Sequence, residues 1–343
     1  GWLKCDNCQL LSIGPSGMRV LVSVCCGALA KTSSTFLAIG DWGGGLLHST
    51  TPAEEAVGRG MQKVAQEADA DYVLALGDNF YPLGIHFWNH FRFNETFEDV
   101  FDGNALGIDW FVIAGNHDHY GDVQAQLDYT KKSARWQFPA LFYSFTKPIP
   151  GGKTAQFVML DSYTLSGMSF YDEATGEPLR DAGPPDAAHA DAQWKWVEQQ
   201  LADSSADYLF TASHYPVWSV CTHGPTADLV TNLRPLLQKY NVTAHLAGHD
   251  HCMQHIEEAG IQYINSGAGS LAWYPTSNRH KIGNATLSWH MADDNRGEHT
   301  GGFASVEMDR EGVVVRYHAE DGAVQYETPK RAPRSPEQEQ VVM

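Results

Sequence analysis

Residues 72–81 read Tyr-Val-Leu-Ala-Leu-Gly-Asp-Asn-Phe-Tyr, so that an apolar run stops at Gly77 and a carboxylate and a phenol follow it. An uninterrupted apolar run of this length is typical of a strand that is buried on both faces. The pattern predicts a strand that ends in a polar loop. The same arrangement, an apolar run that ends in a small residue and then a polar one, recurs at Phe36–Asp41, Trp110–Asn116, Tyr208–His214 and Val242–His249.

Helical segments lie between these five expected strands. Thr51-Pro52-Ala53-Glu54 is a capping box with a proline at the first helical position, and apolar residues follow it at helical spacing from Val57 to Ala65. The same spacing recurs from Trp194 to Leu201, after Asp191, and from Leu229 to Leu237. Because strands and helices alternate, we expect a layered α/β domain.

The pattern changes beyond residue 260. Short alternating runs at 261–264, 302–308 and 313–318 are typical of antiparallel strands, and we expect them to form a second sheet. Residues 166–190 are rich in Gly, Pro and Asp, and we expect a long exposed loop there.

The length and composition fit one large domain or two ordinary ones. The chain has 343 residues, of which 43% are hydrophobic, so it can bury a substantial core. The sequence has no repeat of fixed period and no Gly/Ser linker that would divide it. We expect a leader-like segment over residues 1–30, a single domain over 31–327 and a polar tail over 328–343.

The charge balance argues against a polyanion as the partner. Lys and Arg number 23 against 41 Asp and Glu, which gives a formal net charge of −18. Proteins bind phosphate backbones by neutralising them with Lys and Arg. We therefore expect no binding to nucleic acid.

The segment Met18–Ala30 resembles a short secretory signal, with a basic residue, an apolar run and the small-x-small pattern Ala28-Leu29-Ala30. Alternatively, Val20–Val24 is a strand of the fold. The apolar run is shorter than the about 17 to 25 residues of a transmembrane helix, and we expect no membrane span. A secreted or lysosomal protein would be compatible with three glycosylation sequons, at Asn94, Asn241 and Asn284.

The five strand-end loops are expected to converge, because ligands of open α/β sheets bind outside the carboxyl ends of the strands. Their carboxylate, phenol, amide and imidazole groups suit cations such as iron, zinc and manganese, and the lack of a thiolate cluster argues against a structural zinc site. Asp161 follows a similar apolar run and is assigned only a structural role. The side chains that the five loops supply are Asp41, Asp78, Tyr81, Asn116, His117, His214, His249 and His251.

In their order and amino-acid sequence these loops resemble the motifs of the purple acid phosphatase family. The resemblance is to its single-domain tartrate-resistant type, within the calcineurin-like metallophosphoesterases. The similarity runs from about Phe36 to about Tyr317. It implies a four-layer α/β/β/α sandwich of two mixed sheets. We expect the protein to be a monomer. The blocks that carry it are Gly40-Asp41-Trp42-Gly43, Gly77-Asp78-Asn79-Phe80-Tyr81, Gly115-Asn116-His117-Asp118, Ser213-His214-Tyr215-Pro216-Val217 and Gly248-His249-Asp250-His251.

The resemblance also implies a centre of two metals. Ferric iron would be held by Asp41, Tyr81, His251 and a bridging Asp78. A second, divalent metal (Fe²⁺, Zn²⁺ or Mn²⁺) would be held by Asp78, Asn116, His214 and His249. Related protein phosphatases and phosphodiesterases usually lack the phenol and have a histidine where this chain has Gly43, and the exchange favours ferric iron over a pair of manganese ions.

The implied activity is hydrolysis of phosphate monoesters, which release inorganic phosphate, by in-line attack of a metal-bound hydroxide. His117 and His223 match the family's outer-sphere histidines, which contact the phosphate and assist the leaving group. Asp118 and Asp250 are expected to orient neighbouring imidazoles. Two alternatives are a phosphodiesterase or phosphoprotein phosphatase on the same scaffold, and an iron-binding glycoprotein without enzymatic activity.

The sequence departs from the family at two points. Residues 166–190 take the place of a protease-sensitive loop that represses activity in the family, but they form a longer and different sequence without cysteine. The family's internal disulfide is therefore not expected. Cys221 and Cys252 could pair with each other, or Cys252 could be a small buried residue beside a metal ligand.

Overall fold

The computed structural model describes residues 31–45, 47–167, 183–291 and 301–334. The expected leader at 1–30, most of the expected loop at 166–190 and the end of the expected tail lie outside these ranges. The chain divides into two units, Gly1–Thr32 and Ser33–Met343, and the description below concerns the second unit.

The first sheet contains three of the five expected strands. β1, β2, β3 and β4 run parallel, and β12, β13 and β14 extend the sheet in antiparallel pairs beyond β1. The order is β14-β13-β12-β1-β2-β3-β4. Their bounds are β1 Ser34–Ile39, β2 Tyr72–Ala75, β3 Asp109–Val112, β4 Trp136–Gln137, β12 Gly302–Met308, β13 Val313–Ala319 and β14 Val324–Glu327.

The second sheet contains the other two expected strands, β7 and β8, at its centre. It has the order β11-β9-β10-β8-β7-β6-β5, in which β6, β7, β8 and β10 are parallel and the edges are antiparallel. The bounds are β5 Tyr143–Ile149, β6 Lys153–Met159, β7 Tyr208–Ala212, β8 Ala244–Ala247, β9 Met253–Glu258, β10 Ile261–Ser266 and β11 Thr286–His290.

The two sheets pack face to face through aromatic rings. Phe36 of β1 contacts Phe157 of β6 and Phe210 of β7 edge-on, with ring centroids 5.3 and 5.7 Å apart. All three side chains are fully buried. Such edge-to-face contacts add to the free energy gained from burial of the rings. The expected sandwich of two mixed sheets is therefore confirmed.

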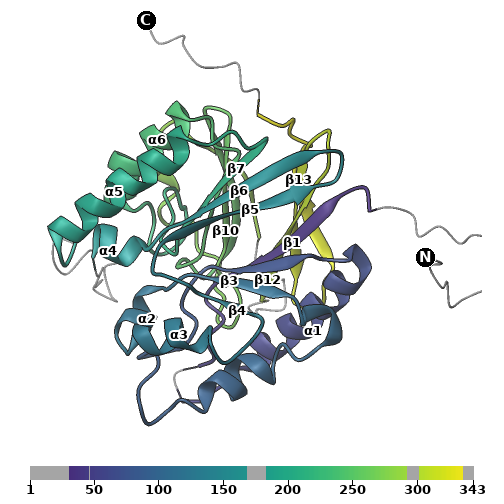
Figure 1. Ribbon diagram of the computed structural model, residues 1–343, viewed down its shortest axis with the longest axis vertical. Coiled ribbons are helices and arrows are strands. Elements are labelled where there is room, and N and C mark those ends of the chain that lie inside the picture. The colour runs from purple at the N-terminus through teal and green to yellow at the C-terminus, as the bar shows by residue number, and fades with distance from the viewer. Residues whose placement is uncertain (1–30, 46, 168–182, 292–300, 335–343) are drawn as a thin grey trace, which may run out of the picture. The chain divides into compact units, whose positions relative to one another are not determined.

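Helices cover the outer faces of the sandwich. Figure 1 shows α1 beside the first sheet and α5 and α6 beside the second. α1 (Pro52–Ala68) begins at the capping box expected from the sequence, in which the Thr51 hydroxyl accepts from Glu54 N and the Glu54 carboxylate accepts from Thr51 N. The short helices are α2 Asn116–His119, α3 Val123–Tyr129, α4 Ser162–Ser166, α6 Arg234–Lys239, the π-helices Phe93–Glu98 and Leu229–Leu233, and the 3₁₀ turns Asn104–Leu106 and Arg279–Lys281.

Two expectations about elements were wrong. α5 (Ala187–Ala202) starts within the expected loop, because Asp186 rather than Asp191 caps it by accepting from Ala188 N and His189 N. The runs at 302–308 and 313–318 do not belong to a second sheet with 261–264. They pair onto β1 instead, because alternation along a strand indicates which side chains are buried but not which free edge the strand joins.

The chain remains attached to the domain after β14. Arg331 exchanges backbone hydrogen bonds with Val313, and Arg334 N donates to Asp207 O at 2.8 Å. The part of the expected tail that the structure describes therefore lies against both sheets.

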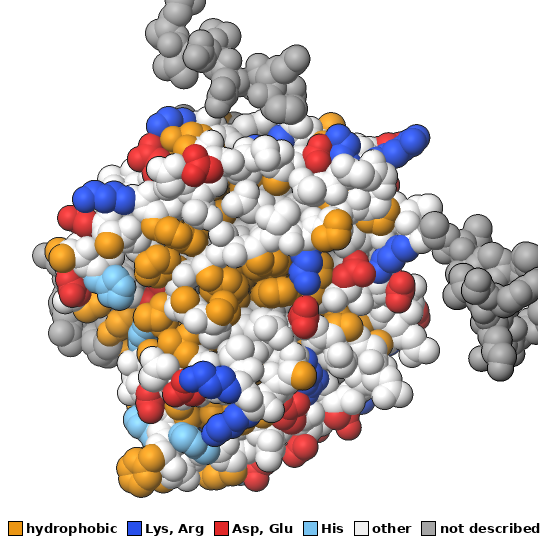
Figure 2. Space-filling view, viewed as in Figure 1, with side chains coloured by type: hydrophobic (Ala, Val, Ile, Leu, Met, Phe, Trp, Pro, Cys, Tyr) orange, Lys and Arg blue, Asp and Glu red, His pale blue; other side chains and the backbone are white. Residues whose placement is uncertain are grey.

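The surface carries charges of both signs. On the face shown in Figure 2, acidic and basic side chains are intermixed, and hydrophobic side chains form a band across the middle. Within the described ranges, none of the helices combines the length and the apolar character that crossing a bilayer requires.

Candidate metal centre

The five polar loops meet where strands of both sheets end. Asp41, just after β1, donates its backbone N–H to Gly77 O at 3.0 Å, which joins the loops of two neighbouring strands. The Asp41 carboxylate then accepts from His249 N at 2.7 Å, which joins the first sheet to the loop after β8. A single buried carboxylate thus links the two sheets at the site.

A glycine directly before each of Asp41, Asp78, Asn116 and His249 makes this approach possible. A Cβ on Gly115 would lie 2.1 Å from Asp78 Oδ1, and a Cβ on Gly248 would lie 2.6 Å from Asp41 Oδ2. Real Cβ atoms do not approach other atoms so closely. The repeated Gly-Asp, Gly-Asn and Gly-His pairs of the sequence therefore leave space for the carboxylates of neighbouring loops.

Three of the polar residues adopt a backbone conformation that only glycine takes up readily. Asp41, Asp78 and His249 have φ angles of 60°, 52° and 67°. Such left-handed residues cost free energy and are concentrated at functional sites. This backbone conformation directs the three side chains toward the same region beyond the strand ends.

A first group of ligand atoms gathers around Tyr81. Its hydroxyl oxygen lies 3.0 Å from Asp41 Oδ1 and 3.0 Å from His251 Nε2, and the latter two atoms are 3.5 Å apart. One oxygen of Asp78 lies within 4.8 Å of the ligand atoms of Asp41 and His251. All four side chains are buried.

A second group gathers around His214. Its Nε2 lies 3.1 Å from Asn116 Oδ1 and 3.4 Å from Asp78 Oδ1. Its Nδ1 is 2.9 Å from Leu76 O, and because a carbonyl only accepts, Nδ1 carries the proton and Nε2 faces the site. The His249 ring stands 5.1 Å from the His214 ring. Asp78 contributes to both groups.

Burial keeps two imidazoles of the site neutral. It lowers the pKa of His251 to about 3 and holds the pKa of His249 well below its usual range. Burial also raises the pKa of Tyr81, and the neighbouring Asp41 carboxylate adds to that effect. Without a strong positive charge nearby, the phenol keeps its proton.

Asp78 and His214 form the charged pair of the site. Burial alone would raise the pKa of Asp78, but His214, His117 and His249 together outweigh burial, and the pKa lies well below its usual range. Burial likewise opposes the charge on His214, yet Asp78, Asp41 and the Leu76 carbonyl together raise the pKa of His214 to about 9. The Asp78 carboxylate therefore stays ionised, and a positively charged partner stabilises it.

These donor sets fit bound cations. Asp41, Tyr81 and His251 bring a carboxylate oxygen, a phenol oxygen and an imidazole nitrogen within 3.5 Å of one another, so one cation could bind all three. His251 Nδ1 is buried without a hydrogen-bond partner among the described residues, so no hydrogen bond to Nδ1 fixes the orientation of the ring. Oxygen and imidazole donors around an ionised carboxylate suit iron, zinc or manganese.

Two further histidines line the site. His117 Nδ1 donates to Pro82 O at 2.5 Å, which leaves Nε2 as its free ring atom, and its ring packs edge-on against Tyr81. The half-buried His223 ring stacks on His249 with centroids 4.2 Å apart. The structure thus brings together all nine residues predicted from the sequence.

The two aspartates next to the ligands act on the backbone. Asp118 accepts from Gly115 N at 2.8 Å and from Asn79 N at 3.1 Å. Asp250 accepts from His223 N at 2.7 Å. Both carboxylates therefore hold the loops that carry the ligands, whereas the sequence had suggested that they orient imidazole rings. Asp161 is structural as expected, since it caps α4 and bonds His119.

Sequence reasoning missed Arg92 and Trp273. The buried Arg92 donates to Gly43 O at 2.7 Å and also to Tyr81 O, so it ties the first two ligand loops together. The Trp273 ring stacks on His251 with centroids 4.3 Å apart. Neither residue lies in a motif. The one signal was that Arg92 is the only cation between Asp78 and Lys131 in the sequence.

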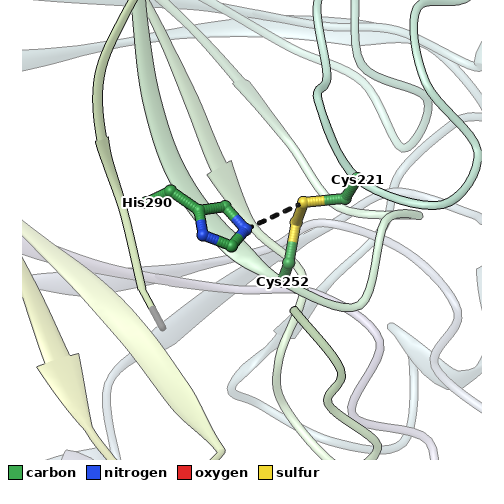
Figure 3. Close-up of side chains that lie close together, drawn as sticks. All are labelled: Cys221, Cys252 and His290. Atoms are coloured by element: carbon green, nitrogen blue, oxygen red, sulfur yellow. Dashed lines mark hydrogen bonds between the residues drawn. A yellow bond between two sulfur atoms is a disulfide. The ribbon is translucent and has the colours of Figure 1, made fainter. Parts of the chain in front are cut away.

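A disulfide connects two of the loops that form the site. Cys221, two residues before His223, is bonded to Cys252, one residue after His251. His290 Nε2 is 3.4 Å from Cys221 Sγ (Figure 3). Of the two possibilities left by the sequence, pairing is therefore the one observed. The bond joins the loop of His223 to the loop of His249 and His251.

A family model and the similar proteins of known name indicate the same family. The calcineurin-like phosphoesterase family matches residues 34–253. Tartrate-resistant acid phosphatase type 5 of Homo sapiens is 42% identical over 311 residues, covering 88% of this chain and 93% of the relative. Purple acid phosphatase 4 of Arabidopsis thaliana is 29% identical over 329 residues, covering 91% and 88%.

Solved structures share the fold. GAP50, the anchor in the inner membrane complex of Plasmodium, superposes with a TM-score of 0.71 at 21% identity, covering 90% of this chain and 91% of that chain. A purple acid phosphatase from yellow lupin seeds gives 0.56 at 15% identity, covering 86% and 53%. At these identities the superpositions show the fold alone.

The glycine contacts predict the effect of one added methyl group. Gly115→Ala places a Cβ against Asp78 and should displace that carboxylate, so we expect metal content and phosphatase activity to fall at least tenfold. The control is Gly107→Ala, whose Cβ would meet its nearest neighbour, Asn104 O, at an ordinary 3.4 Å. Metal analysis per chain measures the effect, and full metal content in Gly115→Ala would contradict it.

The disulfide predicts a non-additive loss of stability. Cys221→Ser, Cys252→Ser and the double variant should each lower the free energy of unfolding by about 2–4 kcal/mol, because each removes the same cross-link. Denaturant unfolding of the three variants measures this. Losses in the single variants that sum to the loss in the double variant would show that the bond is not the common cause.

Proposed function

The chain belongs to the calcineurin-like phosphoesterase family, and from this premise we propose that it is an acid phosphatase of the purple, tartrate-resistant type that hydrolyses phosphate monoesters. The observation that carries the proposal is the position of Asp78. Its carboxylate takes part in both donor groups, so two cations held there would share one ligand. The relatives at about 40% identity over most of the chain are acid phosphatases by name, which favours this activity over the alternatives.

We assign the ligands as the resemblance suggests. Asp41, Asp78, Tyr81 and His251 would hold ferric iron, and Asp78, Asn116, His214 and His249 would hold a divalent ion. When bound, the two cations polarise the phosphoryl group and acidify a water for in-line attack on phosphorus. The protein contributes the fixed ligand geometry, which the glycine contacts and the hydrogen bonds of Asp118 and Asp250 maintain.

Tyr81 and Gly43 support iron as the first metal. Because burial and Asp41 oppose ionisation of Tyr81, a strongly charged cation is needed to bind the phenol as phenolate. A Cβ on Gly43 would lie 2.4 Å from Phe80 N, so the loop leaves no space for a histidine at this position. The site therefore uses a phenolate where related metallophosphoesterases use an imidazole.

His117 and His223 are proposed to act on the phosphate. The hydrogen bond from His117 Nδ1 to Pro82 O fixes the ring and leaves Nε2 for the substrate. The doubly protonated ring would donate its Nε2 proton to the departing alkoxide and keep the proton on Nδ1. His223 is held through its backbone by Asp250 and through its ring by His249. Burial lowers the pKa of His223, so a neutral imidazole at this position favours hydrogen bonding to the substrate over charge pairing.

The remaining assignments follow from the family and the surface. We propose a secreted or lysosomal enzyme that acts as a monomer, with one catalytic domain over residues 31–327. The side chains of Asn94, Asn241 and Asn284 are exposed, as glycosylation would require.

The iron assignment predicts a colour. The oxidised protein should be purple or pink through charge transfer from the Tyr81 phenolate to iron, and Tyr81→Phe should abolish the band. Tyr120→Phe, which changes a phenol near Asn116, is the matched control and should keep it. The measurement is the visible spectrum with iron content per chain. A colourless protein containing iron, or an unchanged band in Tyr81→Phe, would refute the assignment.

The role of His117 predicts a dependence on the leaving group. His117→Ala should lower kcat about 100-fold on an alkyl phosphate, because general acids contribute on this order, and much less on p-nitrophenyl phosphate, whose leaving group needs no proton. His119→Ala, two residues along and bonded to Asp161, is the control. An equal loss on both substrates would indicate that His117 only positions the phosphate.

A further inference from the structure

The described residues expose six large hydrophobic side chains, and four of them lie within nine residues. Leu83, Phe87, Trp88 and Phe91 are 54%, 89%, 61% and 52% exposed. They belong to the segment that follows Tyr81, residues 82–91, which we call the aromatic loop. Scattered exposed apolar residues are ordinary, but a cluster of this kind marks an interaction surface.

The aromatic loop is held in place by its own buried residues. Asn89 is buried, its side chain donates to Gly84 O at 3.1 Å and its Oδ1 accepts from His86 N at 2.5 Å. Buried Ile85 accepts from Asp122 N at 2.6 Å. The exposed rings therefore project from an ordered turn, and their exposure is a property of the fold.

The aromatic loop also differs in charge from the rest of the chain. Residues 79–94 contain no Asp or Glu, although the whole chain has 41. The polar side chains beside the exposed rings are His86 and His90, and His86 stacks on Trp88 with centroids 5.6 Å apart. An acidic protein thus presents one stretch that lacks negative charge and carries aromatic rings.

The aromatic loop adjoins the proposed catalytic residues. Its first carbonyl, Pro82 O, accepts from His117, and a Cβ on Gly84 would lie 2.8 Å from His117 O. Whatever binds the loop is therefore brought next to the phosphate site.

We propose that the aromatic loop docks the enzyme onto a phospholipid surface with zwitterionic headgroups. Phe87 projects almost free of protein neighbours, which suits insertion into a deformable bilayer rather than a pocket of a rigid partner. Trp and Phe flanked by polar groups are the residues of membrane interfaces. Residues 82–91 bring no carboxylate of their own to the headgroups, whereas the net charge of −18 opposes adsorption to an anionic membrane.

Vesicle flotation tests this proposal and does not depend on the phosphatase activity. The full-length protein is mixed with phosphatidylcholine vesicles, and the bound fraction is compared with that of the Phe87→Ser/Trp88→Ser double variant. Val324→Ser, which alters an exposed apolar side chain on β14, is the matched control. We expect at least a tenfold loss of binding in the double variant, no loss in the control and no gain when anionic lipid is added.

Turnover of p-nitrophenyl phosphate in solution should remain within twofold of wild type in both variants, which shows that they are folded. Wild type that does not float, or a double variant that floats equally well, would overturn the proposal. A wild-type dimer that dissociates in the double variant, without vesicle binding, would instead make this surface an interface between two copies of the chain. Stronger binding to anionic vesicles would refute the charge argument.

Discussion

The burial of two carboxylates at the junction of two sheets is the constraint on which the rest of the site depends. Asp41 and Asp78 are almost fully shielded from water, and a buried charge is costly unless it is paired and hydrogen-bonded. Asp41 accepts a backbone hydrogen bond across the sheets from His249, and Asp78 is paired with His214. Burial nevertheless raises the pKa of Asp41 well above its usual range, and the proposed cations would compensate the charge of both carboxylates.

This constraint explains why strain is concentrated there. Asp41, Asp78 and His249 keep positive φ angles, and the neighbouring loops approach so closely that a methyl group at Gly115 has no space. Such a local arrangement opposes folding, and the aromatic core between the sheets must offset it. Phe36 and Phe210 lie on β1 and β7, the strands that lead to Asp41 and His214, so the aromatic core holds the strands from which these loops start.

The sequence was most informative where one local pattern determines one local structure. An apolar run followed by glycine and a ligand predicted strand, turn and site residue together, and all the predicted ligands converge. It was least informative where the outcome depends on distant partners. Nothing in residues 302–308 indicates that they pair with β1, and nothing around Asp250 indicates that its carboxylate binds the backbone of His223. The contacts of Arg92 and Trp273 likewise join segments that are far apart in the sequence.

The net charge illustrates the difference between a global and a local property. A formal charge of −18 argues against a surface that binds a polyanion, yet it would also argue against a phosphate ester as substrate. The substrate is small, however, and at close range it experiences the local field, which a trivalent and a divalent cation would dominate. The Debye length at physiological salt is about 8 Å, so acidic side chains beyond that range from the site contribute little repulsion. An acidic surface and an anion-binding centre are therefore compatible in one chain, because salt screens the exposed carboxylates while burial preserves the field at the centre.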